Sequence, residues 1–272
     1  MKVLAGIVAY QPDFQQLMKN INALEAQVDQ IVIWDNGGAD GFDRDEDIVV
    51  LTDNQRNIGI AAALNRLCEY AEKNGFEWIL TMDQDSIIPE NLISNYLRYV
   101  GNERVALLCP PVLELNGNHT DITSDVDAEY VEMCITSGSF LRISAWRQIG
   151  GFWDELFIDN VDYDICWSLT ENHWKILRVN GLPLCHSLAH SRRVRFLNRE
   201  EIVFNHSPLR CYYIVRNTIA VGRKHNKKRQ CFRWNMKRIL LVNLYEKNRW
   251  EKNKMMLKGI WDGLRIPIPN KQ

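Results

Sequence analysis

The chain has 272 residues, of which 46% are hydrophobic and 25% are charged. This composition excludes a disordered chain and suits one large globular domain, with or without an appendage. The net charge is −1, but residues 216–272 contain 16 Lys and Arg against three acids, so the rest of the chain is acidic. We therefore expect the C-terminal segment to meet an anionic partner or surface.

The seven cysteines are scattered singly, without a C-x-x-C pair. That pattern is typical of free thiols in a reducing cytosol rather than of disulfides or a zinc site. No apolar run approaches the length needed to cross a bilayer, and the run at residues 2–8 fits a first strand better than a signal peptide. The sequence predicts a cytoplasmic protein that is soluble or peripheral to a membrane.

The first third of the chain alternates between short apolar runs and helical periodicities. The expected strands cover residues 2–8, 31–34, 48–51 and 78–82, and the expected helices cover residues 14–24 and 60–71. This alternation predicts an α/β fold with a mostly parallel central sheet flanked by helices. Ligands of such sheets bind beyond the carboxyl ends of the strands.

Asp83 and Asp85 stand where the run at residues 78–82 ends. Strand geometry would place both side chains on the same face. Two carboxylates that close repel each other unless a cation lies between them, and oxygen ligands suit Mg²⁺ or Mn²⁺. The pair therefore indicates a metal site. The alternative is that these acids cap a helix expected over residues 90–100.

Other polar residues lie at the ends of neighbouring strands. Asp35 follows the run at residues 31–34, and Asn57 and Gly59 open the helix that contains Asn65. If the strands are parallel, these residues converge on the crevice that holds Asp83. The structural alternative stays open, because Asp35 begins a good turn sequence and Gly59 precedes three alanines that suit close helix packing.

A second acidic cluster consists of Asp159, Asp162 and Asp164, just before a helical pattern that begins at Ile165. The helix macrodipole explains one or two acids at this position, but not three beside several aromatic residues. A carboxylate in partly apolar surroundings has a raised pKa, which suits a general base. The cluster is therefore a candidate for acid–base chemistry.

His186 and His190 precede the basic residue Arg192. A divalent cation held by two carboxylates needs further ligands, so either imidazole is a candidate, although a buried and hydrogen-bonded histidine is the commoner case. The Arg192 guanidinium suits phosphate oxygens, and a solvated charge is the alternative.

The later elements are less regular than the first ones. We expect a strand at 105–108, a loop or small hairpin at 114–128, a strand pair within 129–135 and 136–141, a strand at 176–179, and helices from Pro208, at 230–247 and at 250–264. The last two helices are basic and contain aromatic residues, so they either lie on an anionic membrane or pack on the domain as a cap. Nucleic acid is not expected, because no recognised binding module accompanies the charge.

The order of these features resembles glycosyltransferase family 2, whose members have the GT-A fold. The resemblance covers residues 2–220 and rests on Asp35, Asn57-x-Gly59, Asp83-Gln84-Asp85-Ser86, Gly150-Gly151-Phe152 and Phe157 to Asp162. Within the family, the sequence of residues 57–65, 80–86 and 212–217 is most similar to that of bacterial rhamnosyltransferases of O-antigen or capsular polysaccharide synthesis. This implies a GT-A domain at residues 1–220 and a basic helical extension at 221–272.

The resemblance also implies roles for the donor site. Asp35 would contact the nucleoside of a nucleotide sugar, Asp83 the ribose or the metal, and Asp85 an Mg²⁺ or Mn²⁺ ion on the diphosphate. His186 fits the third metal ligand better than His190 does, although Ala189 replaces the glycine usual in the family. The remaining residues assigned to the donor are Asn57, Gly59, Asn65 and Arg192.

Asp162 takes the place of the catalytic aspartate of the family, with Asp159 as the second candidate because many relatives have Glu-Asp where this chain has Val161-Asp162. The implied reaction is an inverting transfer of L-rhamnose from dTDP-L-rhamnose to a lipid-linked oligosaccharide at the inner face of the cytoplasmic membrane. Alternatives are a UDP-sugar donor, a nucleotidyltransferase, for which residues 6–13 lack a Gly-rich basic signature, and a non-catalytic sugar-nucleotide-binding protein.

Overall fold

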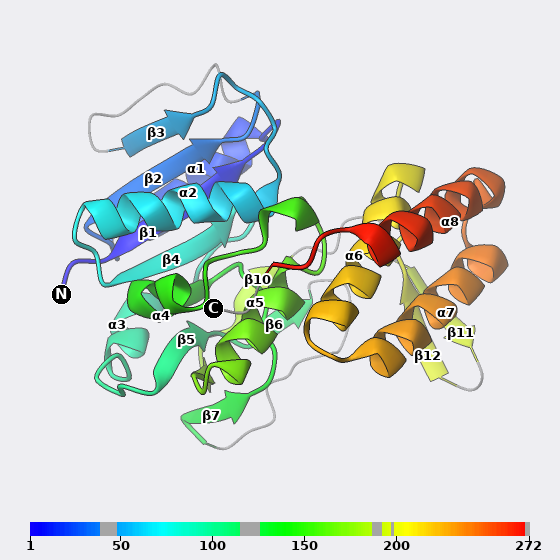
Figure 1. Ribbon diagram of the computed structural model, residues 1–272. Coiled ribbons are helices and arrows are strands. Elements are labelled where there is room, and N and C mark those ends of the chain that lie inside the picture. Colours follow the sequence, from blue (N-terminus) through cyan, green and yellow to red (C-terminus); the bar gives the residue numbers. More distant parts are fainter. Residues whose placement is uncertain (39–47, 115–125, 187–191, 197–198, 270–272) are drawn as a thin grey trace. The chain divides into compact units, whose positions relative to one another are not determined.

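The computed structural model describes residues 1–38, 48–114, 126–186, 192–196 and 199–269 (Figure 1). The chain forms two compact units. The first contains Met1–Phe157 and Val161–Ser187, and the second contains Ile158–Asn160 and Leu188–Lys271. The expected division after residue 220 falls inside helix α6, Pro208–Lys224, and stays a prediction.

The first unit is built on an eight-stranded sheet with the order β3-β2-β1-β4-β8-β5-β9-β7. Its strands are β1 Leu4–Ala9, β2 Gln30–Asp35, β3 Ile48–Thr52, β4 Trp78–Asp83, β5 Val105–Cys109, β7 Ala128–Val131, β8 Ser139–Arg142 and β9 Lys175–Val179. The pairings from β3 to β4 and between β5 and β9 are parallel, and those of β8 and β7 are antiparallel. The expected α/β fold with a largely parallel sheet is confirmed.

Helices cover both faces of the parallel half of this sheet (Figure 1). The helices of the first unit are α1 Phe14–Glu25, α2 Ile60–Lys73, α3 Leu92–Leu97, α4 Ile143–Gln148 and α5 Val161–Glu171, with a short 3₁₀ turn at Asp154–Leu156. Ala5 and Ile7 of β1 belong to the same core cluster as Leu17 and Ile21 of α1. The intervening Gly6 faces Leu67 of α2. Because alternate strand residues point to opposite faces, α1 and α2 lie on opposite sides.

Two expectations about the middle of the chain are wrong. Residues 129–135 and 136–141 do not pair with each other, because β8 lies between β4 and β5 while β7 lies at the sheet edge beside β9. Phe140 of β8 stacks on Trp78 of β4, with ring centroids 5.1 Å apart, which stabilises β8 in its place beside β4 within the sheet. The helix expected from Ile165 begins earlier, at Val161. Most of the loop expected at 114–128 lies outside the described residues.

A small parallel sheet completes the first unit, formed by β6 Val112–Glu114 and β10 Leu184–His186.

The six described cysteines that the structure records as free, Cys68, Cys109, Cys134, Cys166, Cys211 and Cys231, agree with the expected thiols. Among the residues that the structure describes, no helix is long and apolar enough to cross a bilayer.

The second unit contains the hairpin of β11 Arg192–Phe196 and β12 Arg199–Val203, followed by α6, α7 Lys228–Tyr245 and α8 Arg249–Arg265. The predicted helix start at Pro208 is confirmed, and the Ser207 hydroxyl caps α6 by accepting the amide of Arg210 at 3.2 Å. A Cβ on Gly259 or Gly263 of α8 would lie 2.6 Å from a carbonyl oxygen of α6. These glycines therefore let the two backbones touch.

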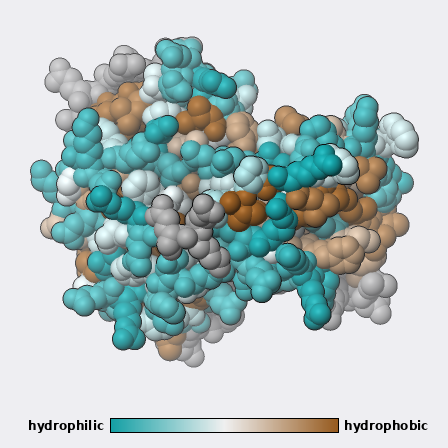
Figure 2. Space-filling model, in the orientation of Figure 1, coloured by the Kyte–Doolittle hydropathy of each residue, from teal (hydrophilic) through white to brown (hydrophobic). Residues whose placement is uncertain are grey.

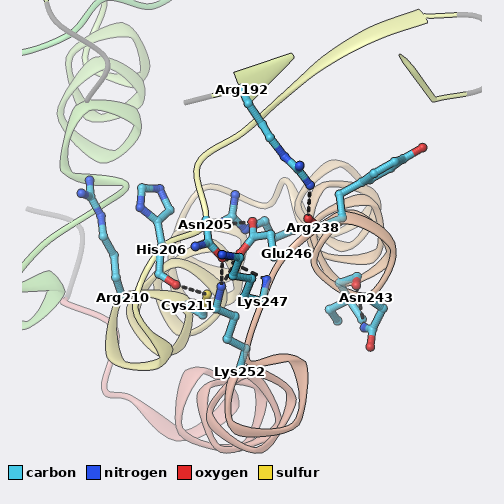
Figure 3. Close-up of polar contacts among 12 residues, drawn as sticks. Arg192, Asn205, His206, Arg210, Cys211, Arg238, Asn243, Glu246, Lys247 and Lys252 are labelled. Atoms are coloured by element: carbon cyan, nitrogen blue, oxygen red, sulfur yellow. Dashed lines mark hydrogen bonds and ion pairs between the residues drawn. The ribbon is translucent and has the colours of Figure 1, made fainter. Parts of the chain in front are cut away.

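A buried ionic cluster joins the loops around these helices (Figure 3). Lys252 is 2% exposed, and its Nζ lies 2.7 Å from Glu246 Oε2 and 2.8 Å from Asn205 Oδ1. Arg238 approaches the other carboxylate oxygen of Glu246 at 3.8 Å. Because a charge this deeply buried needs a partner, the Lys252–Glu246 pair fixes the turn between α7 and α8.

His206 lies at the edge of this cluster, stacked on Phe204 with ring centroids 5.1 Å apart. Burial, and then the positive charges of Arg210, Arg238 and Lys252, lower the pKa of His206 to about 3. His206 is therefore neutral in the folded protein at pH 5, whereas the unfolded chain binds a proton below its ordinary pKa of about 6.5. The linkage makes the folded state lose stability as the pH falls from about 6.5 towards 3.

We expect the variant His206→Gln to be less acid-labile than the parent protein. A side chain that does not titrate cannot contribute a proton-linked loss, so the fall in unfolding free energy between pH 7 and pH 5 should be smaller in the variant. Urea unfolding at pH 7 and pH 5 measures the change in unfolding free energy for the parent protein and for the variant. Equal losses in the two proteins would contradict the assigned cause.

Candidate active site

Two acids flank the carboxyl end of β1. Asp35, the last residue of β2, is paired with Ala9, and Asp83, the last residue of β4, is paired with Val8. The two acids are thus two strand spacings apart, or roughly 10 Å. Asp35 is 4% exposed, and its Oδ1 accepts the amide of Gly37 at 2.9 Å. The structure brings these two predicted residues to one edge of the sheet.

Asp85 differs from the expectation, because β4 ends at Asp83 and the next two residues form a turn. The prediction that Asp83 and Asp85 share one strand face is therefore wrong. The Gln84 amide exchanges two hydrogen bonds with the backbone of Tyr10, at 2.7 and 3.2 Å, which bends the chain out of the strand. The capping alternative is also wrong, since the N-cap of α3 is Asn91.

The chemistry of this turn fits a hard divalent cation. Asp83 is partly exposed and Asp85 is exposed, and both offer carboxylate oxygens. Among the described residues, no group of three or more His, Cys, Asp or Glu side chains could hold a metal ion. Mg²⁺ commonly uses one or two carboxylates and takes its other ligands from substrate phosphates and water. Two acids therefore suit an ion that arrives with a nucleotide diphosphate.

A loop of small residues connects Asp83 with the second acidic cluster. The hydroxyl of Ser137 accepts the amide of Asp83 at 3.1 Å, and the amide of Thr136 donates to Asp162 Oδ1 at 2.7 Å. Because Thr136 and Ser137 are adjacent, the Asp162 carboxylate lies at most about 12 Å from the Asp83 backbone. The first turn of α5 and the end of β4 therefore meet at one loop.

The same loop is held from behind. The Thr81 hydroxyl donates to the Thr136 carbonyl at 2.6 Å, and the fully buried Tyr96 donates its hydroxyl to the Gly138 carbonyl at 2.9 Å. Such buried hydrogen bonds fix the position of the loop and of the groups it contacts. Residues 136 and 137 are contacts that the sequence did not single out, although a Thr-Ser-Gly-Ser run just before a strand was a visible signal.

Asp159 is held differently, within the second unit. Its carboxylate forms a bidentate pair with Arg210, with N–O distances of 3.1 to 3.3 Å. The buried Asn217 donates its amide to the carbonyls of Ile158 and Asp159, at 2.6 and 2.9 Å. Both carboxylate oxygens of Asp159 are thus engaged by a cation. This arrangement favours Asp162 over Asp159 as a proton acceptor.

The two cysteine thiols near this loop do not act as nucleophiles. The Sγ atoms of Cys134 and Cys166 lie 3.9 Å apart. The hydrogen bond between the Cys166 and Cys134 side chains, and then burial, raise the pKa of the Cys166 thiol well above its ordinary value. Since the thiolate is the reactive form, Cys166 serves packing rather than covalent catalysis.

Asn57 and Gly59 form the entry to α2. Asn57 Oδ1 accepts the amide of Gly59 at 2.9 Å, and the amide of Ile60 donates to the Phe157 carbonyl at 2.6 Å. Gly59 has φ +85°, and an added Cβ would lie 2.7 Å from the carbonyl oxygen and 2.8 Å from the Cα of Phe157. Only glycine fits this contact between the start of α2 and the residues before α5.

We expect Gly59→Ala to destabilise the protein by about 3 kcal/mol, because it adds a backbone clash to an unfavourable φ. Gly75 gives the matched control, since its φ is +75° and nothing lies within 4 Å of an added Cβ. Gly75→Ala should cost only about 1 kcal/mol. Urea unfolding of the two variants separates the cost of the backbone conformation from the cost of the clash with Phe157. Equal losses of unfolding free energy in the two variants would mean that the Phe157 contact is unimportant.

Asn65 does not fit the expected contact with the donor. Its Nδ2 donates to the Phe152 carbonyl at 2.8 Å and to Asp154 at 2.6 Å, and its Oδ1 accepts from Trp146 Nε1 and the Phe152 amide at 2.9 and 2.8 Å. All four bonding positions of the amide are therefore used. Asn65 instead holds the turn after Gly151 against α2.

The last two predicted residues are placed less directly. His186 is the final residue of β10, beside Glu114 of β6, while His190 lies outside the described residues. The exposed Arg192 begins β11 in the second unit, where its guanidinium donates to the carbonyl of Tyr245 near the end of α7 (Figure 3). That bond gives Arg192 a structural partner of its own.

Comparison with known proteins identifies the fold and the enzyme class. Residues 6–138 match the family described as Glycosyl transferase family 2. The chain is also 26% identical to the dTDP-rhamnosyl transferase RfbF of Shigella flexneri, over 97% of this chain and 95% of that protein. Together these matches support a glycosyltransferase that is similar to family 2. The family match includes Asp35, Asn57, Gly59, Asp83 and Asp85 and ends before Asp162.

Solved structures support the fold of this glycosyltransferase. The TarS 1-349 structure from S. aureus has a TM-score of 0.59 at 13% identity, covering 97% of this chain and 80% of that one. GalNAc-T7 with UDP, GalNAc and Mn²⁺ has a TM-score of 0.60 at 11% identity, covering 82% of this chain and 48% of that one. These neighbours are GT-A glycosyltransferases, as the resemblance predicted.

Proposed function

We propose that this glycosyltransferase moves L-rhamnose from dTDP-L-rhamnose to a hydroxyl of a lipid-linked oligosaccharide in O-antigen or capsular polysaccharide synthesis. The observation that carries the reaction is the loop at Thr136 and Ser137, which bonds both to the strand end at Asp83 and to the carboxylate of Asp162. The choice of sugar rests on the similarity to RfbF over nearly the full length of both chains.

In this proposal Asp35 and Asp83 bind the nucleoside end of the donor. Their place at the carboxyl edge of parallel strands is where such sheets bind ligands. Asn57 and Gly59 shape the wall of the donor site, and Asn65 and the Arg192 region act through the elements they hold. The negative charge of Asp35 and Asp83 suits the 3′-hydroxyl of the deoxyribose and the imide N–H of thymine, which are hydrogen-bond donors.

Asp85, Asp83 and His186 would hold Mg²⁺ or Mn²⁺ against the donor diphosphate. When bound, the ion would neutralise the charge that develops on the leaving diphosphate. The described acids suffice for the two-carboxylate coordination usual for Mg²⁺. His186 enters this set from the family resemblance alone.

Asp162 is the proposed general base. It would take the proton of the acceptor hydroxyl while that oxygen bonds to the anomeric carbon and the bond from that carbon to the diphosphate oxygen breaks. A single displacement inverts the configuration at the anomeric carbon. The Thr136 amide holds Asp162 Oδ1, which orients the carboxylate for this transfer. Asp159 is less suited, because Arg210 already occupies its carboxylate.

A panel of nucleotide sugars tests the donor. We expect dTDP-L-rhamnose to bind most tightly in calorimetric titrations with Mn²⁺ present, and to be hydrolysed slowly without an acceptor. A preference for a UDP sugar would overturn the choice of donor while leaving glycosyl transfer intact. Binding without hydrolysis or transfer would instead support a non-catalytic sugar-nucleotide-binding protein. A lipid-linked acceptor would also place residues 221–272 beside the anionic inner face of the membrane.

A further inference from the structure

Exposed hydrophobic side chains gather on the last two helices of the second unit. Trp250 is 83% exposed and Trp261 is 57% exposed. Figure 2 shows hydrophobic residues at the surface over this part of the chain. The large exposed members are Phe232, Met236, Leu240 and Leu244 of α7 and Trp250, Leu257, Trp261 and Leu264 of α8, which we call the α7–α8 face. Contiguous exposed apolar surface of this kind marks an interaction site.

The four residues from α8 form a single stripe. They are separated by seven, four and three residues, so they lie above one another on the helix. The buried residues of α8, which include Met256, Gly259 and Gly263, fall on the opposite side. Since Gly259 and Gly263 press against α6, the stripe faces away from the core. A helix that meets only water would carry polar residues there.

The four residues from α7 recur at every fourth position, which also places them in one row. Phe232 and Met236 of this row line a groove of about 470 Å³ together with Ile260 and Leu264 of α8. Leu264 belongs to the α8 stripe, so the two stripes meet at this groove. The length of the α7–α8 face, over two helices of 18 and 17 residues, exceeds what a single small ligand would cover.

Positive charges interleave with this surface. Lys228 stands four residues before Phe232 and extends the α7 row, and Lys254 stands between Trp250 and Leu257 within the α8 row. Arg229 and Arg233 form the neighbouring row of α7. In the described part of the chain, these four cations have no acidic partner. The charge is therefore available to an external anion, in agreement with the excess of 16 basic over three acidic residues at 216–272.

We propose that the α7–α8 face binds the surface of an anionic lipid bilayer. Tryptophan and aliphatic side chains would enter the boundary between headgroups and acyl chains, while the flanking Lys and Arg contact lipid phosphates. A second copy of this chain is a poorer occupant, because two identical basic faces repel each other. The proposed function enters only through the lipid-linked acceptor, which would bring the enzyme to a bilayer.

Vesicle sedimentation tests this surface without donor or acceptor. We expect the protein to bind vesicles of phosphatidylcholine with one third phosphatidylglycerol, to bind pure phosphatidylcholine vesicles weakly, and to be released by added KCl. The variant Trp250→Ala with Trp261→Ala should partition about tenfold less, because it removes the two largest apolar side chains of the face. The variant Arg229→Gln with Arg233→Gln should lose affinity for anionic vesicles and most of its salt dependence.

Met18→Ser is the matched control, since Met18 is an exposed apolar residue of the first unit at 41% exposure. It should bind like the parent protein, and circular dichroism should show equal helix content in all variants. Unchanged binding of the tryptophan variant, or no binding of the parent protein to anionic vesicles, would overturn the proposal. A concentration-dependent dimer that the tryptophan variant abolishes would also overturn it in favour of a second copy. Donor hydrolysis in free solution should stay unchanged, which separates this surface from the proposed function.

Discussion

Replacing Asp162 by Asn is expected to lower kcat for glycosyl transfer by at least about 10³-fold while the Kd of the donor changes by less than about twofold. The substitution removes a proton acceptor but keeps the size of the side chain and an oxygen at Oδ1. That oxygen can still accept the amide of Thr136, which Asp162 Oδ1 accepts at 2.7 Å. The fold of the loop should therefore survive, and the loss should fall on chemistry rather than on donor binding.

Asp159→Asn is the matched control, because the same chemical change occurs three residues earlier. Its main effect should be to weaken the bidentate pair with Arg210, so unfolding free energy should fall by about 1 kcal/mol and turnover much less than in Asp162→Asn. Transfer is measured with saturating donor and acceptor, and donor binding by calorimetry. A variant at 162 that keeps most of its turnover, with a variant at 159 that loses it, would exchange the two roles.

The parallel half of the sheet was predictable because local sequence patterns indicate its strands and helices. The runs that became β1 to β4 are short, apolar and bounded by turn residues, and α1 shows buried Leu17, Ile21 and Leu24 at helical spacing. The position of β8 was not predictable in this way. It depends on Phe140 stacking against Trp78 across 62 positions of sequence, and no local pattern encodes which strands become neighbours.

The site was predictable in its acids but not in its connections. Asp35 and Asp83 follow strands, so parallel topology alone brings them to one edge. The place of Asp85 depended on the side chain of Gln84 bonding to Tyr10, 74 residues away. The link to Asp162 depended on the backbone amide of Thr136, and the Thr-Ser-Gly-Ser run marks a loop there without showing which residue it contacts. Long-range hydrogen bonds of this kind are fixed by tertiary structure. For the same reason, the sequence did not predict the four hydrogen bonds that the Asn65 amide forms within the protein.

Replacing Asp85 by Ala is expected to abolish the dependence of donor binding on Mn²⁺. In the parent protein, Mn²⁺ should tighten donor binding by about 100-fold, or about 3 kcal/mol, because in the proposed site it would pair protein carboxylates with the donor diphosphate. Asp85 is exposed in a turn, so the variant should fold normally. Without metal, its donor affinity should match that of the parent protein, since the substitution leaves the proposed nucleoside contact at Asp35 in place. Calorimetry with Mn²⁺ and with a chelator measures all four affinities.

Glu90→Ala provides the control for this experiment, because Glu90 is an exposed acid five residues further along the chain. It should keep the full effect of Mn²⁺, which would exclude a general influence of negative charge. If Asp85→Ala also keeps that effect, the ion does not use this turn. Asp83→Asn would then decide whether the strand end binds metal at all, because Asp83 keeps its backbone bond to Ser137 whatever its side chain carries. Loss of the Mn²⁺ effect in Asp83→Asn alone would place the ion at the strand end rather than in the turn.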